Sequence, residues 1–439
     1  MRVFTKLRKL LTNERGVYGT TLVVATIAIL STLGIAVLFT SESDTTATTY
    51  DELSKQALYA SETGINNYLW KINQNADYAA EETDPAETGW VSTKSGDYRL
   101  DVSETEGVPG VVIEATGRNA DGDMQATRKI RARVQRKSFT QYLYFTDFET
   151  SEGSGGTIWF ISGDVIHGPL HTNDRVSISG DPVFEGRVTT ARTIYLSGGS
   201  NPDFQQGYEE NVAPLEIPVS NPELKTWAED NGYYYYGETT ILLKAGERVD
   251  ITNSDSRSTG PTGTNLSLPP NGVIFVDGQA GNKFNSANGD IYIEGPMSGE
   301  LNIGAKNNIY ITDDIVYQDA DVDMLGLVAE SYVYINHRDR WGNDVAPVNV
   351  IVNAAVFALN HSFGYEDFRD DEPKGKLTIY VAIAQRYRGP VGTFSWSTGP
   401  VSGYTKDYSY DERMLYQEPP HFVEPLNAGF EFVEWQEIQ

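Results

Sequence analysis

Residues 14–39 read ERGVYGTTLVVATIAILSTLGIAVLF, and this stretch decides how the chain begins. No charged residue occurs from Val17 to Phe39, and the next charge is Glu42. At about 1.5 Å per residue, a helix of this length spans roughly 35 Å, which is enough to cross the apolar core of a membrane. We therefore predict a helix over residues 17–75 whose first part, 17–40, is a transmembrane segment.

The residues ahead of this segment are basic, whereas the rest of the chain is strongly acidic. Arg2, Lys6, Arg8, Lys9 and Arg15, set against Glu14, give the first sixteen residues a charge of +4. The whole chain has a formal charge of −27, so the remainder carries −31 (−27 minus +4). Because basic residues keep their side of a membrane helix in the cytoplasm, this division predicts a cytoplasmic leader, residues 1–16, and an exported acidic body.

The absence of cysteine excludes disulfides, thiol catalysis and cysteine-based metal sites. The small-residue cleavage motif of an ordinary signal peptide is also missing after the apolar run. Instead, Glu14-Arg15-Gly16 stands directly before it, and we expect a cut between Gly16 and Val17 that leaves the whole helix in the mature protein. A plain signal anchor with an incidental glycine is the alternative.

Helical periodicity continues beyond the apolar run. Apolar residues recur at spacings of seven, four and three, at Leu58, Ile65, Leu69 and Ile72. A stripe of small residues, Ala57, Ala60, Ser61 and Gly64, allows close packing against a neighbour. Residues 45–49 are poor helix formers, so a kink or a melted turn between the two halves is one expectation.

The order ERG, apolar helix and then Gln56-Ala57-Leu58-Tyr59-Ala60-Ser61-Glu62-Thr63-Gly64-Ile65 resembles PilX-type minor pilins and the large minor pseudopilins of type II secretion. The resemblance to these type IV prepilin-like proteins covers residues 1–75. It implies that a prepilin peptidase recognises the leader with its basic residues Arg8, Lys9 and Arg15, cuts at Gly16–Val17 and leaves Val17 N-methylated. It also implies single-pass insertion in the inner membrane and packing of the helix against other pilin or pseudopilin subunits, with most of the chain outside the cytoplasm.

One position departs from the family pattern. Major pilins carry a glutamate five residues into the mature chain, where it pairs with the terminal amine of a neighbouring subunit. Here that position is Thr21, which has no charge to offer. In the resembled family this absence is associated with tip or initiator subunits, which implies a minor, tip-proximal subunit.

Residues 76–137 predict a small antiparallel sheet, so that with the helix they form a pilin-like α+β unit. After a polar loop, three strand-like runs follow at 98–102, 111–115 and 128–134. The last run contains the second basic cluster, Arg128, Lys129, Arg131, Arg133, Arg136 and Lys137. A solvated strand face paired with acidic neighbours and a nucleic-acid or lipid-headgroup contact are the two interpretations, and the first is favoured because the protein is so acidic.

Residues 138–439 predict an all-β domain built from short repeated strands. Many of these runs alternate Ile or Val with aromatic or polar residues, as in 175–179, 192–196, 289–293, 308–311 and 331–335. Val176 and Ile194 are 18 residues apart, and so are Ile291 and Ile309. A repeat of this length is typical of a right-handed parallel β-helix, with residues 213–265 as an insertion. A β-sandwich is the alternative fold.

This half is also similar to an uncharacterised β-rich domain that follows PilX-like N-termini. The similarity rests on four stretches, at 168–171, 325–330, 353–360 and 388–392. No activity is implied by it.

Catalytic and metal-binding motifs are absent from the sequence, so we predict no catalytic residue, no metal site and no cofactor. HExxH, Walker and GxSxG patterns do not occur. His167 and His171 flank Gly168-Pro169 and cannot share a helix, while His337 and His361 are a weaker metal candidate. The acidic run Asp319-Ala-Asp-Val-Asp323, after Asp313 and Asp314, lacks the glycine and glutamate of a calcium loop and is better explained as a solvated loop.

These observations favour a structural filament subunit rather than an enzyme. Tyr233 to Tyr236, Trp341 and Trp396 leave a surface or carbohydrate ligand open as a partner, and the acidic charge argues against nucleic acid. A membrane-anchored surface adhesin and a β-helix carbohydrate-active enzyme, which would use paired carboxylates, are the alternatives.

Overall fold

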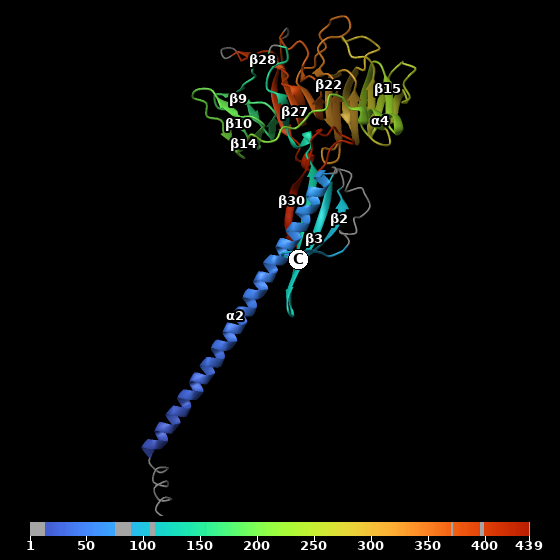
Figure 1. The fold of residues 1–439 in the computed structure, drawn as a ribbon. Helices are drawn as coiled ribbons and strands as arrows, with labels where there is room; N and C mark the ends of the chain where they lie inside the picture. The colour runs from blue at the N-terminus through green and yellow to red at the C-terminus, as the bar shows by residue number, and fades with distance from the viewer. Residues whose placement is uncertain are drawn as a thin grey trace, which may run out of the picture. The chain divides into compact units, whose positions relative to one another are not determined.

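The structure is a computed structural model that describes residues 14–74, 89–105, 110–153, 155–369, 372–395 and 399–438. The chain divides into two compact units. Unit 1 contains the long N-terminal helix, a small sheet and residues 430–438 (blue, cyan and the red strand β30 in Figure 1). Unit 2 contains residues 136–429 and is almost entirely β-structure.

Helix α2 runs without interruption from Glu14 to Gln74, a length of 61 residues. The kink expected at residues 45–49 does not occur, because threonine side chains are accommodated within the helix. Thr49 Oγ1 donates to the carbonyl oxygen of Thr45 at 2.9 Å, and Thr32 and Thr40 make the same four-residue contact. A hydroxyl satisfied in this way adds no unpaired polar group to an apolar surface.

The sheet of unit 1 has five strands in the order β1-β2-β3-β4-β30. Their bounds are β1 Val91–Thr93, β2 Gly96–Glu104, β3 Gly110–Asp121, β4 Met124–Arg136 and β30 Phe430–Ile438. The first four are consecutive antiparallel neighbours. The three predicted strand runs lie in β2, β3 and β4, whereas β1 was not predicted. The fifth comes from the far end of the sequence.

The predicted boundary of the large β domain, 138–439, therefore differs from the structure. Residues 430–438 leave unit 2 and complete the sheet of unit 1, so unit 2 is an insertion between β4 and β30. The physical reason is charge. The last strand reads FEFVEWQEI and carries three acids, and its Glu437 forms an ion pair with Arg128 of the adjacent basic strand β4.

Unit 2 is organised around long series of parallel strand pairs. The longest follows the order β15-β19-β21-β23-β25-β27-β5-β8-β11-β14, with every neighbouring pair parallel. The bounds are β15 Tyr233–Tyr236, β19 Val273–Asp277, β21 Glu300–Ala305, β23 Met324–Ala329, β25 Val350–Ala358, β27 Pro373–Tyr387, β5 Tyr144–Phe148, β8 Leu170–Thr172, β11 Val188–Thr190 and β14 Tyr208–Glu210.

Further parallel series run beside the first one. The order β16-β20-β22-β24-β26 joins Thr239–Lys244, Ile291–Met297, Ile309–Tyr317, Val333–Ile335 and Phe363–Tyr365, and β22 also pairs with β25. Two shorter series are β6-β9-β12 (Phe160–Ile161, Val176–Ser179, Ile194–Leu196) and β7-β10-β13 (Val165–Ile166, Val183–Phe184, Asp203–Phe204). Strand β29, Gly399–Tyr410, lies parallel to β27.

The predicted 18-residue alignment is confirmed at both places where the sequence indicated it. Val176 is the register partner of Ile194, and Ile291 is the register partner of Ile309. The stack that begins with Ile291 and Ile309 continues to Val333 and then to Phe363. Each of these four side chains has at most 2% of its surface exposed. Repeated Ile and Val in the sequence are thus the successive layers of one core.

The predicted insertion at 213–265 differs from the structure in part. Strands β15 and β16, which span residues 233–244, belong to the parallel series, because β15 pairs with β19 and β16 with β20. What projects as an addition is the antiparallel pair β17, Arg248–Thr252, and β18, Gly263–Ser267. Antiparallel pairing also adds β28, Gly392–Ser395, to β29. The unit also contains helix α4, Pro222–Asp230, and two short 3₁₀ helices, η2, Phe139–Gln141, and η3, Glu412–Leu415.

The chain enters unit 2 in the middle of the longest series. Strand β5 pairs on one side with β8, which follows it closely, and on the other with β27, which lies more than 200 residues later. From β5 the chain proceeds to β14 at one end, and residues 213–221 return it to the opposite end at β15 (green to yellow in Figure 1). We call the β27–β5 pairing the seam, since two halves of the unit meet there.

Candidate functional site

The first half of α2 is apolar and uncovered within the chain. Its large aliphatic and aromatic side chains between Val23 and Phe39 are 53–70% exposed. They are Val23, Val24, Ile27, Ile29, Leu30, Leu33, Ile35, Val37, Leu38 and Phe39. They surround the helix on all sides, and the helix is long and apolar enough to cross a membrane.

The residues of the expected cleavage site fall at the start of this helix. Gly16, Val17 and Thr21 lie within α2, and so does Arg15. Arg8 and Lys9 of the leader lie outside the described residues. Cleavage between Gly16 and Val17 stays a prediction, and so does the tip position inferred from the missing charge at Thr21.

The second half of α2 is buried against the sheet of unit 1. The contact is formed by residues on one helix face, namely Leu53, Ala57, Ala60, Ser61, Gly64, Ile65, Tyr68 and Ile72. At Gly117 on β3, an added Cβ would lie 1.9 Å from the carbonyl oxygen of Ala57. A Cβ on Gly64 would lie 2.6 Å from the Tyr98 ring. The predicted stripe of small residues is therefore the place where helix and sheet approach most closely.

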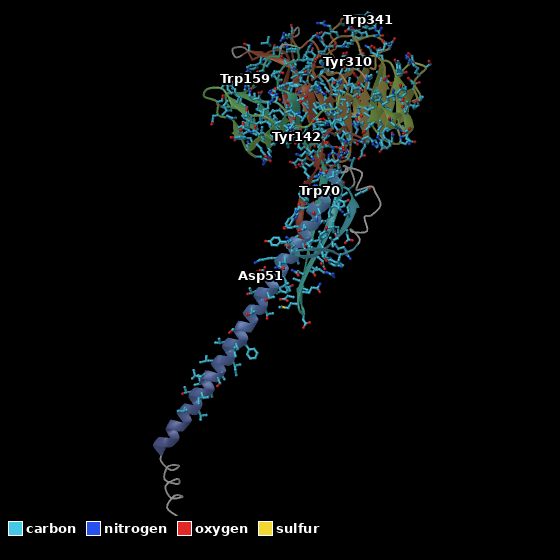
Figure 2. The ribbon with its side chains drawn as sticks, viewed as in Figure 1. Asp51, Trp70, Tyr142, Trp159, Tyr310 and Trp341 are labelled. Atoms are coloured by element: carbon cyan, nitrogen blue, oxygen red, sulfur yellow. The ribbon has the colours of Figure 1, made fainter. Side chains whose placement is uncertain are left out.

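The opposite face of this half carries exposed aromatic residues. Tyr59 is 54% exposed and Trp70 is 64% exposed. Eleven residues separate them, close to three helical turns, so they lie on one face. Figure 2 labels Trp70 on the part of α2 beside the sheet.

The basic cluster of β4 is paired with acids. Arg128 forms an ion pair with Glu437 of β30, and Arg131 lies 3.8 Å from Glu114 of β3. Arg136 pairs with Glu424 within unit 2. These pairs agree with a solvated face neutralised by acidic neighbours.

The four histidines considered as metal ligands are dispersed. His167 lies 2.8 Å from Glu185, and His361 lies 2.6 Å from Glu152. His171 is buried, stacks on Phe145, and burial lowers its pKa to about 4. Within the described ranges no three histidine or acidic side chains gather in a way that could hold a metal ion.

The acidic run at 313–323 is used for local backbone contacts. Asp323 is 2% exposed and accepts hydrogen bonds from the backbone N–H groups of Gly299 and Asp319, at 2.7 Å each. Asp314 accepts one from Ile351 at 2.7 Å. Asp321 makes no contribution to a shared oxygen cage in the described part of the chain.

The aromatic residues expected to contact a ligand have different positions. Tyr233 to Tyr236 form strand β15 inside the parallel series, with Tyr235 fully buried. Trp341 is 82% exposed on a loop (Figure 2), while Trp396 lies outside the described residues. Tyr292, Tyr310 and Tyr334 stack on one another with centroids 5.1 and 6.2 Å apart. Their ring faces cover each other, which leaves little aromatic face open for a sugar.

A buried ion pair at the seam had no signal in the sequence. Arg388 Nη1 donates to Glu149 Oε2 at 2.9 Å, and the two side chains are 4% and 1% exposed. Arg388 follows β27 and Glu149 follows β5, so the pair joins the two halves of unit 2. Its residues are separated by 239 positions, which is why local pattern analysis could not find it.

Comparisons with known proteins give limited matches. A family model described as a domain of unknown function (DUF4900) matches residues 97–192, which is less than a quarter of the chain. No curated protein matches. Among solved structures, the crystal structure of the competence-associated pilin ComZ from Thermus thermophilus has 10% sequence identity and a TM-score of 0.29, covering 88% of this chain and 97% of that one. At this TM-score the likeness supports no statement about fold or function.

Proposed function

We propose that the chain is a minor subunit of a type IV pilus or a type II secretion-like filament, inserted in the inner membrane by the first half of α2. The observation that supports this is the division of one continuous helix. Residues 23–39 expose apolar side chains all round, whereas residues 53–72 bury one face on a sheet. Each exposed Val, Ile or Leu forgoes about 1.5–3 kcal/mol of burial, so this half requires lipid or neighbouring apolar helices.

The proposed route to the filament is cleavage by a prepilin peptidase between Gly16 and Val17, after a leader containing Arg8, Lys9 and Arg15. The mature helix would then pack against other pilin or pseudopilin subunits. Thr21 supplies no carboxylate for pairing with a terminal amine, which favours a tip position over repeated placement along the shaft. An antibody against unit 2 that labels the whole shaft would contradict the tip position.

We further propose that the parallel series of unit 2 form a right-handed parallel β-helix. The support is the set of long parallel pairings with an 18-residue register, together with the strong preference of parallel crossovers for the right hand. Such a body is rigid because each layer packs on two neighbours. Its proposed role is scaffolding or recognition outside the cytoplasm, without catalytic turnover.

The experiment is the mass of the mature N-terminal peptide, from cells with and without prepilin peptidase. A peptide that begins at Val17, and that is lost without the peptidase, supports the filament subunit. Gly16→Leu should abolish processing, and Gly19→Leu, a matched glycine change beyond the cut, should leave it intact. An uncut N-terminus in both strains would contradict the proposal and leave an anchored surface protein.

A further inference from the structure

A pocket of about 500 Å³ lies in unit 2, within the size range of small-molecule sites. Its lining residues come from the two arms of a hairpin, 149–153 and 155–158, and from two successive layers of strands: Glu149, Thr150, Thr157, Asp174, Arg175, Ser177, Arg192 and Thr193. The hairpin is fixed by the hydrogen bond from Ile158 N to Glu149 O at 3.1 Å and by the Thr150–Thr157 bridge.

The two strand layers place equivalent residues side by side. Val176 and Ile194 are register partners, and Ser177 pairs with Tyr195. The 18-residue offset therefore sets Asp174 near Arg192, whose charged groups lie 3.5 Å apart. Trp159 lies beside the same layers, with its ring centroid 5.8 Å from that of Tyr195 (Trp159 is labelled in Figure 2).

Arg175 has an aromatic partner but no acidic one. Its guanidinium lies 5.1 Å from the centre of the Tyr195 ring, and among the described residues no carboxylate is within ion-pairing distance. Arg257 offers a contrast, because it lies over Tyr236 at 3.3 Å and also pairs with Asp255 at 2.6 Å. Although the chain has a net charge of −27 and acids line the same pocket, Arg175 has no acid paired with it within the residues that the structure describes, so its N–H donors are available to a ligand.

Ser177 gives a second, independent indication of a ligand. It is 1% exposed and lines the pocket, and its hydroxyl has no hydrogen-bond partner in the described part of the chain. A buried hydroxyl without a partner costs free energy, so a ligand atom that supplies one is favoured.

The acids of the pocket limit which anion could enter. The Glu149 carboxylate is occupied by Thr146 and Arg388. Asp174 accepts the backbone N–H of Glu149 at 3.2 Å and lines the pocket beside Arg192. Asp174 would repel a phosphate dianion more strongly than a singly charged carboxylate, because the repulsion scales with the charge of the ligand. A carboxylate carried on a sugar could accept from the guanidinium groups, while neighbouring sugar hydroxyls donate to Asp174.

We propose that this pocket binds a carboxylate-bearing sugar residue of a polysaccharide. Arg175 and Arg192 hold the carboxylate. The hydroxyl groups of the lining exchange hydrogen bonds with the ring hydroxyls; they belong to Ser177, Thr193, Thr150 and Thr157. A neutral sugar would leave Arg175 without a partner, and a plain carboxylate would leave the hydroxyl groups unused. This inference rests on the recognition role proposed above and adds the class of ligand. Binding at the pocket does not require filament assembly, so the two proposals can fail separately.

The test is ligand-observed NMR titration of the purified full chain in detergent micelles. Four probes are compared: digalacturonate, its methyl ester, neutral digalactose and glutarate. We expect digalacturonate to bind in the millimolar range, and the other three to bind at least tenfold more weakly. Because uncut protein is used, the result is independent of leader processing and separates failure of this site from failure of the proposed function.

Three variants locate the site. Arg175→Gln should weaken digalacturonate binding by tenfold or more, which corresponds to the loss of a charge-assisted hydrogen bond of about 1.4 kcal/mol or more. Ser177→Ala should weaken it by several-fold. The control Arg257→Gln removes another aromatic-stacked arginine, one that does not line the pocket, and should leave binding unchanged. Circular dichroism melting of each variant shows whether the fold is retained.

Three results would overturn the proposal. The first is that digalacturonate shows no binding at concentrations up to tenfold above the millimolar range. The second is equal binding of the acid and its ester, and the third is unchanged digalacturonate binding by a folded Arg175→Gln protein. Equal binding of glutarate and digalacturonate would overturn the sugar assignment, because it would show that the carboxylate alone is recognised.

Discussion

Gly117 gives the sharpest test of how α2 is held on the sheet. A Cβ at this position would lie 1.9 Å from Ala57 O, 2.7 Å from Ser61 N and 3.0 Å from Ala57 C. Real Cβ contacts are essentially never shorter than 3.0 Å, so the helix must retreat by about 1.1 Å (3.0 minus 1.9). The obstructing atoms are backbone, and no rotamer change can relieve them.

The cost of Gly117→Ala follows from this retreat. A radial gap of 0.5–1 Å forfeits a quarter to a half of the dispersion energy of each contact, and the buried side chains Ile65, Tyr68 and Ile72 share the interface. Overpacking of this kind costs about 1–3 kcal/mol, and we expect the upper part, about 2–3 kcal/mol. Amide exchange in β3 and in residues 53–72 should then quicken by about 30- to 150-fold.

Hydrogen-exchange mass spectrometry of the full chain measures this directly. The matched control is Gly122→Asn, at the tip of the same hairpin, where an added Cβ meets nothing within 4 Å. Its φ of +59° is one that asparagine tolerates, so we expect exchange within threefold of the parent protein. An exchange rate in Gly117→Ala that stays within threefold, or equal acceleration in the control, would refute the close contact of helix and sheet.

Three further predictions concern other parts of the chain. Arg388→Met should lower the free energy of unfolding of unit 2 by about 3–5 kcal/mol, because Glu149 is left buried without its partner. Adding Glu149→Leu should recover much of this loss in urea denaturation, and an equal loss in the double variant would contradict the prediction. Burial raises the pKa of Glu418 to about 8, above the value of about 4.5 in the unfolded chain, so its contribution to stability should be greatest below pH 4.5 and decline as the pH rises to 8. The urea midpoint of Glu418→Gln should therefore fall less steeply with pH than that of the parent protein. An unchanged slope would contradict this prediction. Ending the chain after Gly429 should remove β30, leave β4 as an open edge and raise amide exchange in β4 more than tenfold, while β9 serves as the internal control and should not change.

Local patterns in the sequence were sufficient for the elements that repeat. The uncharged run from Val17 to Phe39 predicted a long apolar helix, and the small residues at Ala57 and Gly64 predicted its close contact. The 18-residue spacing of Val176 and Ile194 predicted their stacking, because identical inward positions recur once per layer. Each of these signals depends on residues near one another in the sequence.

The pairing of strands that are far apart in the sequence could not be predicted, because these signals are local. Strand β5 lies between β27 and β8, yet the sequence pattern of a layer says nothing about which other layer it pairs with. The fifth strand of unit 1 was likewise missed, although its Glu437 pairs with Arg128 of the basic β4. The pocket at Arg175 could not be predicted, since it requires the two hairpin arms, 149–153 and 155–158, to lie against two strand layers.

The polar groups at the seam bear on how β5 finds its place. Parallel layers of Ile and Val are nearly interchangeable, and a strand that enters in mid-series could pair with several of them. At the seam, however, Gln385 Nε2 donates to the Tyr144 hydroxyl at 2.9 Å, and Arg388 meets Glu149. Any other register would bury these groups without partners, at a cost of about 1–3 kcal/mol for each neutral group and more for each charge. These buried polar groups at the seam thus penalise incorrect pairings more than they stabilise the correct one, and they lie where β5 is joined to a neighbour more than 200 residues away.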